Sequence, residues 1–468
     1  MNSIRCSLGL IVTALLLLTV GCGQEEASWA RFHGSDGQGI AEVEGLPVTW
    51  NAEGQGVRWR TEVPGRGNSS PVVHSGRIFL TTAVEAEEPT PQGRRRFHRI
   101  VLAYDLASGE KLWQTQLFTA PEEPKHRMNT FAAPTPVTDG ERVYAFFGEV
   151  LAALDLDGQV MWQQQVDPRF IAESHYGAAS SPVLTEDSVI LFQDREVVAD
   201  DQQGWLGAFS KDNGEELWRI HWDNSCCAYT TPLVVDRGAG EELYVAHSGS
   251  IAAYSAATGE EFWREAVPIN QLVSSPVLEG DMLGISGGAH GVRHTRFFQL
   301  AGSGAETTRE MLWEDPRQAP HTASPVLYNG LFFAVTDKGV VTCWDAQTGE
   351  VYWQERLEQW HNRVSLVAGD GKVYVPSTWG RTSVLAASQE FQLLGQNDLD
   401  GTKCNASPAI ADGCLLLRTG GHLWCIDGTS TSDFPSPADQ EEAPQEEADQ
   451  GAADESASGE GDASDEDA

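Results

Sequence analysis

Basic residues are scarce in this sequence. It has 31 Lys and Arg residues against 68 Asp and Glu residues, and its formal net charge is −37 at pH 7. The triplet Arg94-Arg95-Arg96 is an isolated cluster, and an isolated cluster in an acidic chain offers no sustained surface for neutralising phosphates. We therefore expect a solvated loop at the triplet and no nucleic-acid partner.

Long apolar runs are missing after residue 22. Residues 1–22 carry Arg5, an apolar stretch from Leu8 to Leu18, and small residues before Cys22, which is the pattern of an export signal. The apolar stretch is too short to span a bilayer as a helix. No later stretch is long enough to do so, and we expect the body of the protein to be soluble.

The export signal resembles that of bacterial lipoproteins, although Thr19 stands where leucine is commoner. The resemblance implies that Cys22 becomes the lipidated first residue of the mature chain. The alternative is an ordinary signal peptide with a chance cysteine. Because Gly23 is not an aspartate, the resemblance further implies an exported, periplasm-facing protein anchored in the outer membrane, with lipid as its one membrane contact.

The eight cysteines lack the two-pair spacing of a zinc site. Cys343 and Cys425 align with alanines of the repeats described next, so we expect them to be small buried residues. Cys404 and Cys414 lie ten residues apart, and spacing alone leaves open whether they form a bridge.

The chain does contain a repeated phrase. In Cys343 to Trp353, CWDAQTGEVYW, a short strand leads through a tight Thr-Gly turn into a second strand that ends on an indole. The other copies are Ala103 to Trp113, Ala153 to Trp162, Ala208 to Trp218 and Ala253 to Trp263. We expect the tryptophans at this position to dock on the next repeat; they are Trp59, Trp113, Trp162, Trp218, Trp263, Trp313 and Trp353.

A second phrase consists of Ser-Pro or Thr-Pro followed by apolar residues and a turn. It lies roughly two strands before the tryptophan phrase of the same repeat. It begins at Ser70, Thr135, Ser181, Thr231, Ser275, Ser324 and Ser407, and an eighth copy at Ser365 has Leu366 in place of proline. A period of about 40 to 50 residues with four short strands and one Trp is typical of a propeller blade. The sequence therefore predicts an all-β, eight-bladed β-propeller of four-stranded antiparallel blades.

An N-terminal strand is expected to close the ring. Val57 to Val63 matches the last strand of a blade, whereas the last repeat, Ser407 to Asp427, supplies three strands and stops. The predicted divisions are a signal at 1–22, a Gly-rich segment at 23–56, the propeller at 57–427 and an acidic tail at 428–468. Gln440 to Ala468 contains no Lys or Arg, and we expect the tail to be disordered.

The phrase A-x-D-x-x-T-G-x-x-x-W resembles the tryptophan-docking motif of pyrroloquinoline-quinone (PQQ) repeat propellers, and the resemblance covers about residues 29 to 427. That family includes PQQ dehydrogenases and cofactor-free relatives, such as the BamB-like lipoproteins of the outer-membrane β-barrel assembly machinery. The resemblance therefore implies the fold more strongly than it implies an activity.

In such a propeller, the loops that lead into the innermost strands converge on one face and form a funnel, which is the default binding site. The alternative is that their polar residues solvate the loops and bridge neighbouring blades. The candidate funnel residues are Asn68, Asn129, His175, Tyr176, Cys226, Cys227, Tyr229, His321, His361, Asn362, Arg363 and Asn405.

A quinoprotein enzyme needs Ca²⁺ held by carboxylate and amide oxygens, an aspartate base, and a tryptophan beneath PQQ. The candidate set contains no carboxylate, so we predict neither catalytic nor metal-binding residues. Some PQQ-dependent alcohol dehydrogenases resemble this chain in having adjacent cysteines, which there form a disulfide against the cofactor. Cys226-Cys227 can be such a disulfide or two separate thiols.

The leading hypothesis is a non-catalytic, lipid-anchored, monomeric propeller that needs no cofactor and binds an envelope protein or glycan partner. The second is a periplasmic quinoprotein dehydrogenase that uses PQQ and Ca²⁺ on an alcohol or a sugar. The third is a carbohydrate-binding propeller that uses the aromatic and amide groups of the funnel.

Overall fold

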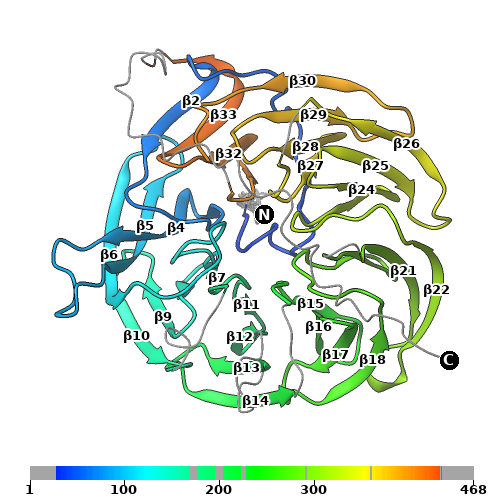
Figure 1. The fold of residues 1–468 in the computed structure, drawn as a ribbon, viewed down its shortest axis with the longest axis horizontal. Coiled ribbons are helices and arrows are strands. Elements are labelled where there is room, and N and C mark those ends of the chain that lie inside the picture. Colours follow the sequence, from blue (N-terminus) through cyan, green and yellow to red (C-terminus); the bar gives the residue numbers. More distant parts are fainter. Residues whose placement is uncertain are drawn as a thin grey trace, which may run out of the picture.

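Eight small β-sheets stand around a central axis (Figure 1). The structure is a computed structural model, and it describes residues 28–168, 176–194, 204–222, 228–289, 292–358, 361–403, 405–432 and 434. Each sheet is a blade of four antiparallel strands, and blade 7 has a fifth strand that pairs in parallel. The predicted eight-bladed propeller is therefore confirmed.

From β3 to β33 the strands follow one another from blade to blade in chain order, whereas β1 and β2 join the last two blades. Blade 1 holds β3 (Val72–His74), β4 (Arg77–Glu85), β5 (Arg96–Asp105) and β6 (Lys111–Pro121). Blade 2 holds β7 (Val137–Thr138), β8 (Arg142–Phe146), β9 (Val150–Asp155) and β10 (Val160–Gln165). Blade 3 holds β11 (Val183–Leu184), β12 (Ser188–Gln193), β13 (Gly204–Ser210) and β14 (Glu216–Trp222). Blade 4 holds β15 (Leu233–Asp236), β16 (Glu241–His247), β17 (Ser250–Ser255) and β18 (Glu261–Ala266).

Blade 5 includes a single 3₁₀ turn, η1 (Gly304–Glu306), before its last strand. Its strands are β19 (Val277–Glu279), β20 (Met282–Gly287), β21 (His294–Ala301) and β22 (Thr308–Asp315). Blade 6 holds β23 (Val326–Tyr328), β24 (Leu331–Val335), β25 (Val340–Asp345) and β26 (Val351–Arg356). Blade 7 holds β27 (Val367–Gly369), β28 (Lys372–Pro376), β29 (Thr382–Ala386), β30 (Leu393–Asn397) and the parallel β1 (Ile40–Ala41). Blade 8 holds β31 (Ala409–Ala411), β32 (Cys414–Arg418), β33 (His422–Thr431) and β2 (Gln55–Glu62).

The core lies between neighbouring blades. Every residue of β24 is buried, because a middle strand packs against a blade on each side, whereas most of the outermost strand β10 is exposed. This explains why the inner strands read as continuous apolar runs rather than as alternating patterns.

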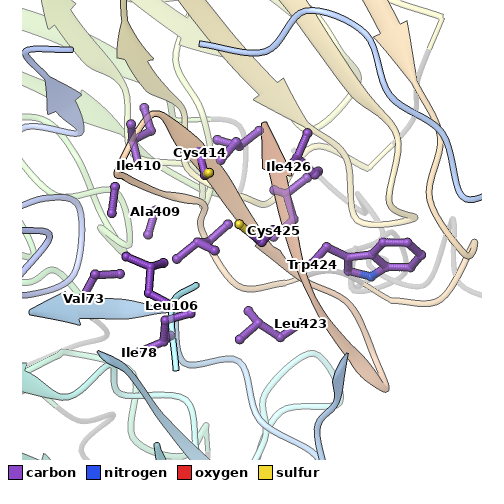
Figure 2. Packing of buried hydrophobic residues seen from close by; sticks show 14 of the residues in the cluster. Val73, Ile78, Leu106, Ala409, Ile410, Cys414, Leu423, Trp424, Cys425 and Ile426 are labelled. Carbon is purple, nitrogen blue, oxygen red and sulfur yellow. The ribbon is translucent and has the colours of Figure 1, made fainter. Parts of the chain in front are cut away.

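The ring closes between the first and last strands of the propeller. β2 pairs antiparallel with β33, with Trp59 opposite Cys425 (Figure 1). Across the closing interface, residues of β31 to β33 pack near Val73, Ile78 and Leu106 of blade 1 (Figure 2). Closure packs the face of the last blade against the face of the first, and the prediction of an N-terminal closing strand is confirmed.

Six of the seven docking tryptophans bond to the next blade. Each of these indoles donates its Nε1–H to a backbone carbonyl 2.8 to 3.1 Å away, in or just before the turn of the neighbouring repeat; the donors are Trp59, Trp113, Trp162, Trp218, Trp313 and Trp353. Trp263 faces blade 5, which lacks the Thr-Gly turn. In the described part of the chain the Nε1 of Trp263 has no acceptor, and its ring lies 4.8 Å from the Arg309 guanidinium.

A closed ring of hydroxyls encircles the axis. The first residue of each Ser/Thr-Pro phrase donates its backbone N–H to the hydroxyl of the same residue in the next blade, at 2.9 to 3.3 Å. The eighth bond, from Ser407 to Ser70, completes the circle. The ring uses the hydroxyl and not the proline, and Ser365 keeps its place in the ring although Leu366 replaces proline.

The N-terminal segment crosses the axis. It bridges the innermost strands of several blades: Trp29 pairs with Val73, and the carbonyl of Ala30 accepts from Thr138 N–H. On the other side, Gln38 Oε1 accepts from Leu278 N–H at 2.7 Å. Arg31 and His33 between these contacts are 5% and 1% exposed. Burial thus lowers the pKa of Arg31 to about 10 and also lowers that of His33.

The basic triplet of blade 1 is more structured than expected. β4 and β5 form a long hairpin, Arg96 begins β5, and Arg95 pairs with Glu122 at 2.6 Å. The expectation of a solvated loop thus holds for the tip of the hairpin alone. Nearby Arg99 is fully buried.

The described cysteines are free thiols. Cys343, Cys414 and Cys425 are fully buried, and Cys414 and Cys425 come from the adjacent strands β32 and β33 (Figure 2). Cys414 therefore makes no bridge, and Cys404 lies outside the described residues. No helix among the described residues has the length and apolar character to cross a membrane.

Candidate functional site

The loops before the innermost strands bring polar side chains together at one face. We call this cluster the funnel mouth; it comprises Lys125, His126, Arg127, Tyr176, Tyr229, His321, Asp337 and Arg363. The N-terminal segment contacts the innermost strands from the other end, so the two groups lie on opposite sides of the hydroxyl ring.

Three rings of the funnel mouth form a continuous row across blades 2 to 4. The rings of His126 and Tyr176 lie 5.8 Å apart, and those of Tyr176 and Tyr229 lie 6.0 Å apart in an edge-to-face arrangement. Backbone and amide bonds hold the row: His126 N–H donates to the Tyr176 carbonyl, and so does Asn129 Nδ2 at 2.8 Å. The row presents flat aromatic surface edged by polar atoms.

Positive charge from three blades converges on His126. Burial is the main cause that lowers the pKa of His126. Four nearby cationic groups lower it further, those of Arg127, Arg363, His321 and Lys125. Arg127 and Lys125 share its loop, whereas His321 and Arg363 come from the loops before β23 and β27. The funnel mouth is therefore electropositive in a strongly acidic protein.

The loop that carries these cations is anchored by a buried ion pair. Arg99 and Glu123 are 0% and 4% exposed at their side chains, and their charged atoms lie 2.6 Å apart. The Arg99 guanidinium also lies 4.8 Å from the Phe131 ring. Burial raises the pKa of Glu123 to about 7 in spite of Arg99.

Carboxylates that the sequence analysis did not place here also reach this face. Asp337, in the turn between β24 and β25, lies 3.5 Å from His321. Burial opposes its ionisation, but the hydrogen bond and charge of His321 lower the pKa of Asp337 overall. In blade 8, Asp400 accepts from His422 Nδ1 at 3.0 Å and from Thr419 Oγ1 at 2.9 Å. Both acids are thus already paired.

These residues do not fit a calcium-quinone site. Ca²⁺ takes six to eight oxygen ligands, and a catalytic site needs carboxylates that converge on it. In the part of the chain that the structure describes, no three His, Cys, Asp or Glu residues gather closely enough to hold a metal ion. Asp337 and Asp400 each face a histidine instead.

The predicted asparagines mainly join blades. Asn68 Nδ2 donates to the Met128 carbonyl at 3.1 Å, and Asn129 Nδ2 donates to the Ala178 carbonyl at 3.0 Å. Asn362 is fully buried, and its backbone N–H donates to the Asp337 carbonyl. Asn405 is half-buried. For Asn68 and Asn129, the structure supports the alternative that they bridge neighbouring blades.

His361 is exposed and has a left-handed backbone, with φ of 63°. Its carbonyl accepts from Thr378 N–H, which places it beside Trp379, a residue that is 51% exposed. The remaining candidates, Cys22, His175, Cys226 and Cys227, lie outside the described residues.

Sequence reasoning missed Lys125, His126 and Arg127 although they stand in a predicted funnel loop. The signal was present as the run PKHR, which ends two residues before Asn129. Asp337 was missed because it comes from a turn between two middle strands, and that turn reaches the same face as the loops before the innermost strands.

Comparison with known proteins places the sequence in a family. The family profile described as outer membrane protein assembly factor BamB matches residues 27–203, 202–295 and 299–403. The chain belongs to this BamB-like family of PQQ-repeat propellers. BamB of Yersinia pestis is 20% identical over 320 residues, 68% of this chain and 66% of the relative. BamB of Burkholderia pseudomallei (strain K96243) is 27% identical over 259 residues, 44% of this chain and 65% of the relative.

The matches thus span just under two thirds of either family member. Among solved structures, BamB from Moraxella catarrhalis has a TM-score of 0.55 at 15% identity, covering 78% of this chain and 97% of that chain. Quinohemoprotein alcohol dehydrogenase from Pseudomonas putida HK5 has a TM-score of 0.59 at 12% identity, covering 88% of this chain and 82% of that chain. At such identities both likenesses show the fold alone, and BamB and an alcohol dehydrogenase share it.

Proposed function

We propose that the chain is a non-catalytic, lipid-anchored scaffold of the bacterial envelope that binds a protein partner. The observation that carries the proposal is the match to the BamB family profile, because the fold by itself does not separate scaffolds from enzymes. The relatives are named outer membrane protein assembly factors, and that name supports a partner among envelope proteins. The chemistry of the described carboxylates supports a role without PQQ or Ca²⁺.

The outer rim of blades 1 to 3 is the surface that we assign to the partner. Leu112 on β6, Met161 on β10 and Leu217 on β14 each stand directly before a docking tryptophan. They are 45%, 52% and 54% exposed. Single exposed apolar residues are ordinary, but these three recur at one position of successive blades, and we assign this row of positions to the partner.

A pull-down from solubilised envelope tests this proposal. The unmodified protein is expected to capture a protein partner, and the triple variant Leu112→Ser, Met161→Ser, Leu217→Ser is expected to lose it. The matched control carries Met311→Ser and Val351→Ser, which change equally exposed residues on blades 5 and 6. The proposal fails if no protein partner is recovered, or if the control loses the partner as completely as the triple variant.

The localisation that we propose is the periplasmic side of the outer membrane, with anchoring through lipid on Cys22. It is supported by the export-signal pattern and by the names of the relatives. Membrane fractionation tests it: the unmodified chain should sediment with the outer membrane, and Cys22→Ala should not. Equal sedimentation of both would contradict lipid anchoring at this residue.

Glycan binding is a second candidate, and the exposed indole of Trp379 beside His361 favours it. Exposed aromatic planes at a loop face can stack on sugar rings. A glycan array probed with the protein, and with Trp379→Ala as control, decides the question. No hit on the array would remove this candidate.

A further inference from the structure

The distribution of basic residues in the fold points beyond a partner-binding rim. Lys125, Arg127, His321 and Arg363 all act electrostatically on His126. Burial is the main cause that lowers the pKa of Lys125. Arg66 and Arg95 lower it further, whereas Glu122 and Glu123 raise it in part. Like charges repel, so such a cluster in a chain of net charge −37 is stabilised when an anion joins it.

Arg363 has a buried N–H that such an anion could accept from. Within the described chain its buried Nε has no hydrogen-bond partner. The one acid of the funnel mouth, Asp337, is engaged by His321 and by the backbone N–H of that residue. A buried guanidinium N–H without an acceptor is costly, and a carboxylate is the acceptor that suits it best.

The chain carries a segment of complementary charge. Gln440 to Ala468 contains twelve Asp or Glu residues and no Lys or Arg. The last described residue, Phe434, packs on blade 8, with its ring 4.6 Å from the Arg60 guanidinium and 6.1 Å from the Trp424 ring. The 34 residues that follow can span about 110 Å when extended, so the segment is long enough to reach any face of the propeller.

We propose that the acidic segment 440–468 of the same chain docks on the funnel mouth and pairs its carboxylates with Arg127, Arg363 and Lys125. Because the two partners are covalently linked, their effective concentration is of millimolar order, and weak individual ion pairs suffice. The segment then competes with any other anionic ligand for this face. The pairing is electrostatic, so salt screens it. This inference does not rest on the proposed scaffold function.

The six lysines provide an internal test of the proposal. Lys125, Lys338 and Lys403 lie in loops and turns of the funnel face. Lys211 lies in a turn of the opposite face, and Lys111 and Lys372 begin strands that leave turns of that face. A carbodiimide that joins carboxylates directly to amines is added to the full-length protein at low salt, and the products are mapped by mass spectrometry. We expect links from residues 440–468 to the first three lysines and not to Lys111, which is exposed like Lys338 and Lys403, whereas Lys125 is half-buried.

Two perturbations separate docking from random collision. Raising NaCl to 0.5 M, or introducing Arg127→Ala together with Arg363→Ala, should lower the yield of these links at least about fivefold. Lys111→Ala is the matched charge control and should leave the yield unchanged. An unchanged thermal melting temperature shows that a variant is folded; if the double variant melts early, the salt series and the lysine pattern still decide. Equal linking to both faces, or no linking to the funnel face, overturns the proposal.

Discussion

The glycine of the Thr-Gly turn meets two constraints at once. Gly349 has φ of 74°, a conformation that suits glycine, and the sequence pattern predicts this much. The structure adds a contact: a Cβ on Gly349 would lie 2.6 Å from the ring of Trp313 in the preceding blade. The turn of one blade therefore packs directly against the docking tryptophan of the preceding blade, and glycine is needed for this contact as well as for the turn.

Replacing two glycines separates these constraints. Gly371→Ala, at φ of 67° with open space around it, should cost about 1 to 2 kcal/mol of unfolding free energy through backbone strain. Gly349→Ala should cost about 1 to 3 kcal/mol more, because the indole must move. Urea denaturation midpoints measure the difference. Equal losses would show that the indole contact does not constrain this position.

His247 is a buried neutral imidazole between blades 3 and 4. Its Nε2 lies 2.9 Å from the Tyr254 hydroxyl, which accepts from Arg264 at 2.6 Å. Burial, and secondarily the charge of Arg264, lowers the pKa of His247 to about 3. The unfolded chain binds this proton near the ordinary value of 6.5, so the stability that depends on neutral His247 is complete above that pH and is lost as the pH falls towards 3.

His247→Gln should remove this pH dependence and keep a side-chain partner for Tyr254. Between pH 6 and 4 the unfolding free energy of the unmodified protein should fall by up to about 1.4 kcal/mol per pH unit more than that of the variant. Denaturation midpoints at several pH values provide the comparison. Parallel pH profiles for the two proteins would mean that His247 does not titrate on unfolding.

At the scale of elements, the hydroxyl ring explains the Ser/Thr-Pro phrase. Two residues before each innermost strand stands a hydroxyl that accepts a backbone N–H from the blade before it, and all eight of these residues are buried. A buried N–H without an acceptor is costly, so the hydroxyl cannot be lost without penalty. Thr135 and Thr231 serve in the ring as well as serine does.

Ser324 offers the sharpest test of the ring. Ser324→Ala leaves the backbone N–H of Ser275 without its acceptor and should cost about 1 to 3 kcal/mol of unfolding free energy. Ser324→Thr keeps the hydroxyl and should cost much less. Chemical denaturation of both variants is the measurement. If Ser324→Thr lowered the unfolding free energy as much as Ser324→Ala does, the effect would come from packing and not from the hydrogen bond.

Most strands could be predicted because one repeat unit is used eight times. The exceptions are places where a blade departs from the repeat. Blade 5 replaces the Thr-Gly turn with a 3₁₀ turn, and Trp263 consequently lacks a carbonyl acceptor among the described residues. Blade 1 lengthens its middle strands into a hairpin, which buries Arg99 beside Glu123. Neither arrangement follows from local pattern, because each depends on the neighbouring blade.

At the scale of the whole molecule, the sequence predicted which loops meet but not which side chains dominate. It selected Tyr176, His321 and Arg363, which the structure does bring to the funnel mouth. It also selected Asn68 and Asn129, which join blades. Sequence order does not show how far a loop residue reaches towards the axis. For that reason the sequence did not identify His126 and Asp337 as residues of the funnel mouth.

Our central proposal is that this propeller acts as a scaffold and does not bind PQQ. The most direct measurement is calorimetric titration of the purified protein with PQQ in the presence of Ca²⁺, followed by dye-reduction assays with alcohols and sugars. We expect no saturable heat and no dye reduction, because Asp337 and Asp400 are held by His321 and His422. Stoichiometric, Ca²⁺-dependent PQQ binding with dye reduction would contradict it.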